Sequence, residues 1–120
     1  MLFRSGHPWI TPRRGRTCYE MADRACGLAG FRPRVVAESN DFTVQLELVA
    51  SGIGVALVPD LTVATVPPGV LLATPAVPVR RHIYAARRTV RRGDPGLDRL
   101  TAELRAAAEI CVRPHGARPA

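Results

Sequence analysis

The 120-residue chain contains no lysine, few aromatic residues (5%) and only three cysteines. Cys18 and Cys26 fall on one expected helix at a separation of about 12 Å along its axis, which exceeds the reach of a disulfide. Their spacing matches no zinc site, and His7, His82 and His115 are isolated in the sequence. These absences exclude a disulfide scaffold. We expect no metal or other cofactor, and we expect the cysteines to act as small core residues.

Long apolar runs are also missing from the sequence. No run approaches the roughly 18–20 residues that span a bilayer, and Met1 to Ile10 lacks the apolar segment of a secretory signal. Proline and glycine occur 11 and 10 times without a period, so a fibrous repeat is excluded. The sequence therefore predicts a reduced, cytoplasmic globular protein with no membrane partner.

All 17 basic residues are arginine, and with 10 acidic residues the net charge is +7. Two interpretations are open: an arginine-rich solvated surface, or a surface for nucleic acid. The arginines are scattered as short groups without interleaved aromatic residues, which is a poor pattern for reading a groove or a single strand. The sequence favours the solvated surface, and we expect no DNA-binding residues in this chain.

The first half of the chain alternates between strand and helix patterns. Apolar patterns and cap residues predict strands at 9–11, 34–38 and 53–58, with helices at 18–29 and after Ser39-Asn40-Asp41. Thr17 and Glu20 match a capping box. Residues 42–48 also alternate like a strand, but the cap residues and Gly52 favour a helix. The continuous apolar run at 53–58 predicts a strand buried on both faces of a parallel sheet. The fold class is therefore α/β.

The second half is patterned more weakly. It predicts short strands at 70–73 and 80–88, joined by a proline-rich connector at 74–79. A helix begins at Asp94-Pro95 and carries an apolar stripe that ends at Cys111. One strand and one helix cannot close a core of their own. We expect them either to pack on the first half or to belong to a sheet formed by other sequence.

No catalytic constellation is present in the sequence. Gly52-Ile53-Gly54 precedes a strand, whereas a dinucleotide loop follows one. Ser51 does not lie in a nucleophile elbow, and a helix-terminal serine is the better interpretation. We therefore expect no enzyme. Two expected helix N-termini, at residues 16–18 and 39–41, meet at the carboxyl edge of the sheet, where free N–H groups and nearby arginines suit a small carboxylate. The alternative is that these residues only cap their own helices.

The chain resembles a known family in several stretches. These are Gly6-His7-Pro8-Trp9-Ile10, Gly30-Phe31-Arg32-Pro33 and, most specifically, Leu-Val-Ala-Ser-Gly-Ile-Gly-Val-Ala-Leu-Val-Pro at residues 48–59. They look like the effector-binding domain of LysR-type transcriptional regulators. The resemblance implies a periplasmic-binding-protein-like (type 2) α/β fold. Residues 6–75 then form most of the second subdomain. Residues 76–111 supply a connector, strand and helix that return to the first subdomain, while 1–5 are an unmatched start and 112–120 a flexible tail.

The resemblance also implies a function. A small, anionic metabolite would bind in a cleft between the subdomains and alter DNA binding by a helix-turn-helix, in a regulator that forms homo-oligomers. The helix-turn-helix and most of the first subdomain are expected to lie outside this chain. The matching effector contacts are Thr11, Arg16, Thr17, Cys18, Ser39 and Asn40. The alternatives are a stand-alone solute-binding module and a non-functional gene remnant.

Overall fold

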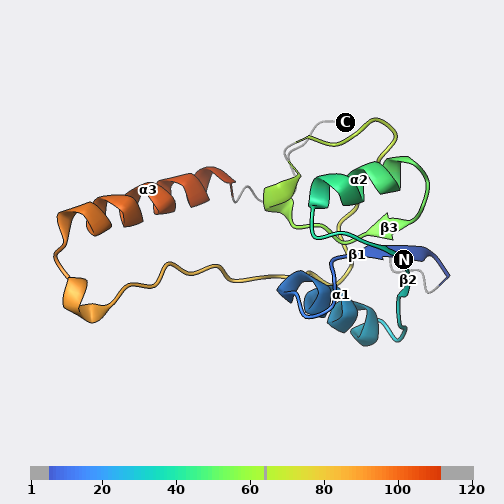
Figure 1. Cartoon of the computed structure of the whole chain (residues 1–120), viewed down its shortest axis with the longest axis horizontal. Coiled ribbons are helices and arrows are strands. Elements are labelled where there is room, and N and C mark those ends of the chain that lie inside the picture. The colour runs from blue at the N-terminus through green and yellow to red at the C-terminus, as the bar shows by residue number, and fades with distance from the viewer. Residues whose placement is uncertain (1–5, 64, 112–120) are drawn as a thin grey trace. The chain divides into compact units, whose positions relative to one another are not determined.

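The computed structural model describes residues 6–63 and 65–111. Its contacts divide the chain into two compact units, Met1–Arg80 and Arg81–Ala120. The first unit contains three strands and two helices, and the second contains one long helix (Figure 1). The expected start at 1–5 and tail at 112–120 lie outside the described residues. Each unit is therefore described by itself.

A three-stranded parallel sheet forms the centre of the first unit. Its strands are β1 (Pro8–Thr11), β2 (Arg34–Glu38) and β3 (Val55–Ala56), in the order β2-β1-β3. The register places Trp9 opposite Val35 on one side and Val55 on the other. The predicted alternation of parallel strands and helices is confirmed. Because β1 is hydrogen-bonded on both sides, its position depends on both neighbours.

The third strand is shorter and less buried than the sequence predicts. Only Val55–Ala56 pair with β1, and both residues are half-buried. The prediction of a strand over 53–58, buried on both faces, is wrong in these respects. The Ile53 amide donates to the Leu48 carbonyl at the end of the preceding helix, so this residue cannot join the ladder. The strand then lies at the edge of the sheet, with one hydrogen-bonded neighbour.

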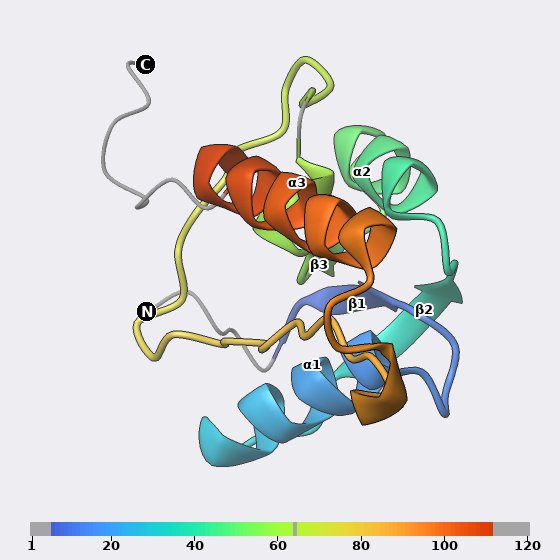
Figure 2. The same cartoon turned by 90° about the vertical axis from the view of Figure 1, so that its left-hand side faces the viewer.

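Two helices lie on opposite sides of the sheet, as Figures 1 and 2 show: α1 (Thr17–Leu28) and α2 (Phe42–Ala50). Both end in the same way, with a glycine of positive φ at position C′, Gly30 (85°) and Gly52 (76°). In each case the next amide reaches back to a carbonyl in the last turn, as in a Schellman motif. The predicted helices and their glycine stops are confirmed, including the helical interpretation of residues 42–48.

The beginnings of the two helices differ from each other. Asp41 caps α2, since its Oδ1 accepts from the Thr43 amide at 2.8 Å. The predicted capping box at Thr17 is wrong: Arg16 occupies the N-cap of α1, and its side chain makes no cap hydrogen bond. The Glu20 amide already donates to the Arg16 carbonyl, so the helix begins one residue earlier than the box requires.

The core of the first unit lies between the sheet and its helices. It consists of Trp9, Ile10, Tyr19, Ala22, Cys26, Leu46 and Val63. Ile10 at the centre of β1 is fully buried, and Trp9 packs against Phe31 with ring centroids 6.0 Å apart. The core is small because each helix contributes only two or three buried side chains. Residues at which the strands contact one another therefore contribute strongly to the free energy of unfolding of this unit.

The second unit has one regular helix, α3 (Pro95–Cys111). Asp94 caps it, since Oδ1 accepts from the amides of Gly96 (3.0 Å) and Leu97 (3.2 Å), which confirms the predicted start. Arg87 forms an ion pair with Asp98 on this helix. The apolar stripe is confirmed as a pattern, but Leu100 and Leu104 are about half exposed, so the described residues leave the stripe uncovered.

Two predicted strands are absent from the described residues. Residues 80–88 have no regular structure, because no strand in the described part of that unit lies beside them to complete a ladder. Residues 70–73 also form no strand: the Val70 amide donates to the Pro67 carbonyl in a turn, and Leu71 is exposed. The predictions of strands at these two places are therefore wrong.

Gly27 offers a simple test of the helix assignment. It lies in α1 at an exposed position, and no heavy atom lies within 4 Å of the Cβ that an alanine would add. Gly27→Ala should raise the free energy of unfolding by about 0.5–1 kcal/mol, because alanine loses less backbone entropy in a helix. Urea unfolding followed by Trp9 fluorescence measures this change, and a decrease would contradict the assignment.

Candidate functional site

The candidate site lies where β1 and β2 end and the two helices begin. The loop after β1 and the loop after β2 are joined by two hydrogen bonds: the Ser39 amide donates to the Thr11 carbonyl, and the Arg13 amide donates to Asn40 Oδ1, both at 3.0 Å. The carboxyl ends of two parallel strands therefore form one connected edge, which is the usual place for a ligand in such sheets.

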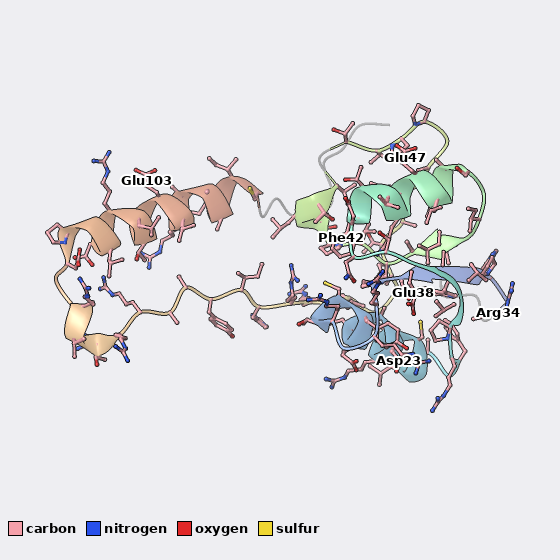
Figure 3. All side chains as sticks on the ribbon, viewed as in Figure 1. Asp23, Arg34, Glu38, Phe42, Glu47 and Glu103 are labelled. Atoms are coloured by element: carbon pink, nitrogen blue, oxygen red, sulfur yellow. The ribbon has the colours of Figure 1, made fainter. Side chains whose placement is uncertain are left out.

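Two shallow hollows lie at this edge. The first has a volume of about 300 Å³ and is lined by Pro12, Arg16, Thr17, Cys18, Asn40 and Phe42. The second, of about 510 Å³, is lined by Asn40, Asp41, Phe42, Thr43 and Thr62. Asn40 and Phe42 line both hollows. Figure 3 labels Phe42 at the start of α2 and Glu38 at the end of β2.

The structure brings together four of the six predicted contact residues: Arg16, Thr17, Cys18 and Asn40 line the first hollow. Thr11 and Ser39 do not line it. Thr11 is only 1% exposed, and its Oγ1 is buried without a hydrogen-bond partner among the described residues. The Ser39 hydroxyl accepts from the Asp41 amide within a local turn. These two residues contribute to the edge through the hydrogen bond between their backbones.

Two residues that line the first hollow, Pro12 and Phe42, were not predicted from the sequence. Both are apolar. Pro12 follows Thr11, a contact that the resemblance implied, and Phe42 follows Asp41, which was predicted as a cap residue. Their position next to these residues was the signal in the sequence that could have identified them as lining residues. Phe42 is half-buried and gives both hollows an apolar wall.

The two helix N-termini at the edge differ electrostatically. At α2 the Asp41 carboxylate already satisfies the Thr43 amide and opposes the positive end of the helix dipole. At α1 the N-cap residue is itself a cation, Arg16, and its side chain makes no cap hydrogen bond. The neighbouring Arg14 lies over the Tyr19 ring, 5.8 Å from its centroid. An anion is therefore favoured at α1 and disfavoured at α2.

The cysteines divide into three environments. Cys26 is fully buried, and burial, with a smaller effect of the Asp23 charge, raises its pKa from 9.0 to about 11. Cys18 is half-buried at the first hollow, and Cys111 is exposed on α3. The prediction that all three are core residues is therefore correct for Cys26 only.

The motifs considered for other chemistries have structural roles. The Ser51 hydroxyl donates to the Glu47 carbonyl at 2.9 Å, as expected for a helix-terminal serine. Gly52 is the C′ residue of α2, and Gly54 lies against the Pro8 backbone. Among residues 6–63 and 65–111, no group of three or more His, Cys, Asp or Glu side chains could hold a metal ion. None of the described helices is both long and apolar enough for a membrane span.

A comparison with protein-family models identifies the family of the chain. The model of the LysR substrate binding domain matches residues 5–109. The chain belongs to the LysR substrate-binding domain family. Domains of this family are parts of transcription regulators and not of enzymes, and the small α/β unit with its three-stranded parallel sheet is consistent with their type 2 periplasmic-binding-protein-like fold. No curated protein and no solved structure gives a significant match to the chain.

Proposed function

We propose that this LysR substrate-binding domain senses a small anionic effector at the first hollow. The observation that carries the proposal is the α1 N-terminus: its N-cap residue, Arg16, makes no side-chain cap hydrogen bond and lines a hollow together with Asn40 and Phe42. Effector binding would then change how the full regulator, a cytoplasmic homo-oligomer, holds DNA through its helix-turn-helix. The family membership supports effector sensing in general, and the geometry supports the anion.

The residues of the hollow give each part of the effector a place. An acidic group accepts hydrogen bonds from backbone N–H groups of the first turn of α1 and from the Thr17 hydroxyl, with Arg16 supplying positive charge. Pro12 and Phe42 provide apolar walls for a compact body. Asp41 at the adjoining hollow repels a second negative charge. These groups favour an effector with one acidic group on a small, flat apolar body.

The volume of the hollow fits a partial site. About 300 Å³ lies at the lower end of the range of ligand pockets, and this hollow is shallow and open to solvent. A second wall would come from the first subdomain of the regulator, which closes over the effector. The open and closed arrangements would be the two states whose populations the effector shifts.

Titration of the ¹⁵N-labelled chain with sodium benzoate tests the anion site. Benzoate combines one carboxylate with a flat apolar ring, and uncharged benzamide of nearly the same shape is the matched ligand control. We expect saturable shifts at the amides of Thr17, Cys18 and Asn40 with benzoate and none with benzamide. Equal shifts with both compounds would contradict the anion site.

Removing the charge of Arg16 should weaken this binding. Arg16→Gln is expected to raise the benzoate Kd by about tenfold, because a charge-assisted interaction at a half-open site contributes about 1.4 kcal/mol. Arg99→Gln removes the same charge from an exposed position on α3 and serves as the matched control. If both variants bind benzoate equally, the attraction is one of net charge and Arg16 has no special role.

A further inference from the structure

Gln45 is the only polar side chain that α2 buries completely. It lies in the second turn of the helix, beside the core residue Leu46, and has no exposed surface. Glutamine is usually exposed, and a buried amide is costly unless it is hydrogen-bonded. An apolar residue would suit this position for packing alone. The amide at Gln45 therefore needs a separate explanation.

The amide is directed at the turn that follows β2. Its Nε2 donates to the Ser39 carbonyl at 2.6 Å. The assignment of nitrogen and oxygen is fixed by this contact, because a carbonyl can only accept. The Oε1 atom is buried and has no partner among the described residues. One half of the amide is thus used and the other half is left unsatisfied.

Helix α2 does not depend on this bond. The Asp41 side chain already caps the helix by accepting from the backbone amide of Thr43. The backbone N–H of Gln45 donates the ordinary helical hydrogen bond to the Asp41 carbonyl. What the bond does is fix the backbone of Ser39 from a second side. The Ser39 amide is held by the Thr11 carbonyl of β1, and the Ser39 carbonyl is held by Gln45.

The fixed backbone of Ser39 determines where Asn40 lies. Asn40 follows directly, lines both hollows, and accepts through Oδ1 from the Arg13 amide in the loop that leads to Arg16. The Gln45 side chain is therefore linked through Ser39 and the adjoining Asn40 to the Arg13 amide. This connection reaches both of the loops that border the first hollow. Gln45 is not among the residues that line either hollow.

We propose that Gln45 is a positioning residue for the effector site: its buried amide holds the Ser39–Asn40 turn in the shape that the first hollow requires. The proposal rests on the proposed function for the role of the hollow. The hydrogen-bonded turn can be tested without any ligand, so a failure of benzoate to bind would count against the effector site alone.

Amide hydrogen exchange in the 120-residue chain tests the turn. Gln45→Met keeps the length of the side chain and removes the donor. We expect the Arg13 amide, bonded to Asn40, to exchange about tenfold faster, with little change at the Phe31 amide, which is bonded to the Cys26 carbonyl at the far end of α1. Leu46→Val, a core change at the next position, should instead affect the two amides equally.

A second variant keeps the shape and makes the donor depend on pH. In Gln45→Glu the protonated carboxyl can donate to the Ser39 carbonyl, whereas the carboxylate cannot, and burial raises the pKa of such a carboxyl. The Arg13 exchange rate, divided by that of the parent at the same pH, should be close to one at pH 5 and rise about tenfold by pH 8. A residue that only fills space would show no such profile at Arg13 relative to Phe31.

The effector site gives the final readout. Where benzoate binds the parent chain, Gln45→Met should raise its Kd about tenfold, although the variant keeps every residue that lines the hollow. An unchanged Kd would overturn the positioning role. Exchange at Arg13 that stays as slow as in the parent, or that rises only in step with Phe31, would overturn it as well, with or without ligand.

Discussion

Gly54→Ala should lower the free energy of unfolding by about 3 kcal/mol. The Cβ of an alanine at this position would overlap the Pro8 carbonyl oxygen and lie 3.0 Å from the carbonyl carbon. Both are backbone atoms of β1, so no side chain can move aside to make room. Either β3 separates from β1 or β1 shifts, and β1 is the central strand of a small sheet. Urea unfolding monitored by the buried Trp9, the only tryptophan, measures the loss.

Gly6→Ala is the matched control for this change. Gly6 precedes the same strand, and no heavy atom lies within 4 Å of its added Cβ. Its free energy of unfolding should stay within about 0.5 kcal/mol of the parent, as is usual for surface substitutions. If Gly54→Ala and Gly6→Ala have the same urea midpoint, the close approach of β3 to β1 is not part of the folded chain.

The Gly54 contact also bears on the candidate site. β1 begins at Pro8, whose backbone Gly54 approaches closely, and ends at Thr11, whose carbonyl accepts from the Ser39 amide. A shift at one end of a four-residue strand is transmitted to the other end. Gly54, the second glycine of the Ser-Gly-Ile-Gly-Val segment, thus allows β3 to pack closely against β1. Through β1 it also helps to position the edge at which the hollows lie.

The sequence predicted best those elements whose ends are marked by local chemistry. Residues 42–48 fitted a strand and a helix equally well by periodicity. Asp41 before the segment and Gly52 after it decided correctly for the helix, because each satisfies specific backbone groups in the structure. The same holds for α3, where Asp94 caps the helix. Cap residues act within a few positions, so a single sequence contains their whole interaction.

Strands were predicted less well because their partners lie elsewhere in the chain. The runs at 70–73 and 80–88 have suitable residues, but no neighbouring strand among the described residues completes a ladder with them. β3 was predicted too long. Its expected first residue, Ile53, donates its amide to the Leu48 carbonyl at the end of α2 and not to the neighbouring strand. A strand is stabilised by hydrogen bonds from another segment, and no local pattern reveals whether that segment is present.

The candidate site was predicted only in part, because some of its features depend on contacts between separate segments of the chain. Arg16, Thr17, Cys18 and Asn40 line the first hollow because they flank helix beginnings at one edge of the sheet, a position that the order of elements determines. Gln45 could not be predicted, since its role depends on burial against a turn six residues away in the chain. Thr11 and Ser39 were placed at the correct edge, but their side chains are directed to the fold instead of the hollow.

Raising the pH from 8 to 11 should destabilise the folded chain through Cys26. Burial, followed in size by the charge of Asp23, raises the pKa of this thiol from 9.0 to about 11 in the folded state. In the unfolded chain the thiol loses its proton near its ordinary pKa, so between pH 9 and 11 the unfolded state binds fewer protons. The stabilisation is fully present below pH 9 and is lost as the pH approaches 11.

The size of this loss is set by the pKa difference, at about 1.4 kcal/mol per unit, which gives a decrease on the order of 1–3 kcal/mol by pH 11. Cys26→Ala isolates it, since every other titrating group is the same in both chains. The difference in the free energy of unfolding between parent and variant should be constant below pH 9 and shift by this amount in favour of the variant as the pH rises. Parallel curves for the two chains would mean that the folded thiol is not shielded from water, and would place α1 farther from the sheet than its buried residues indicate.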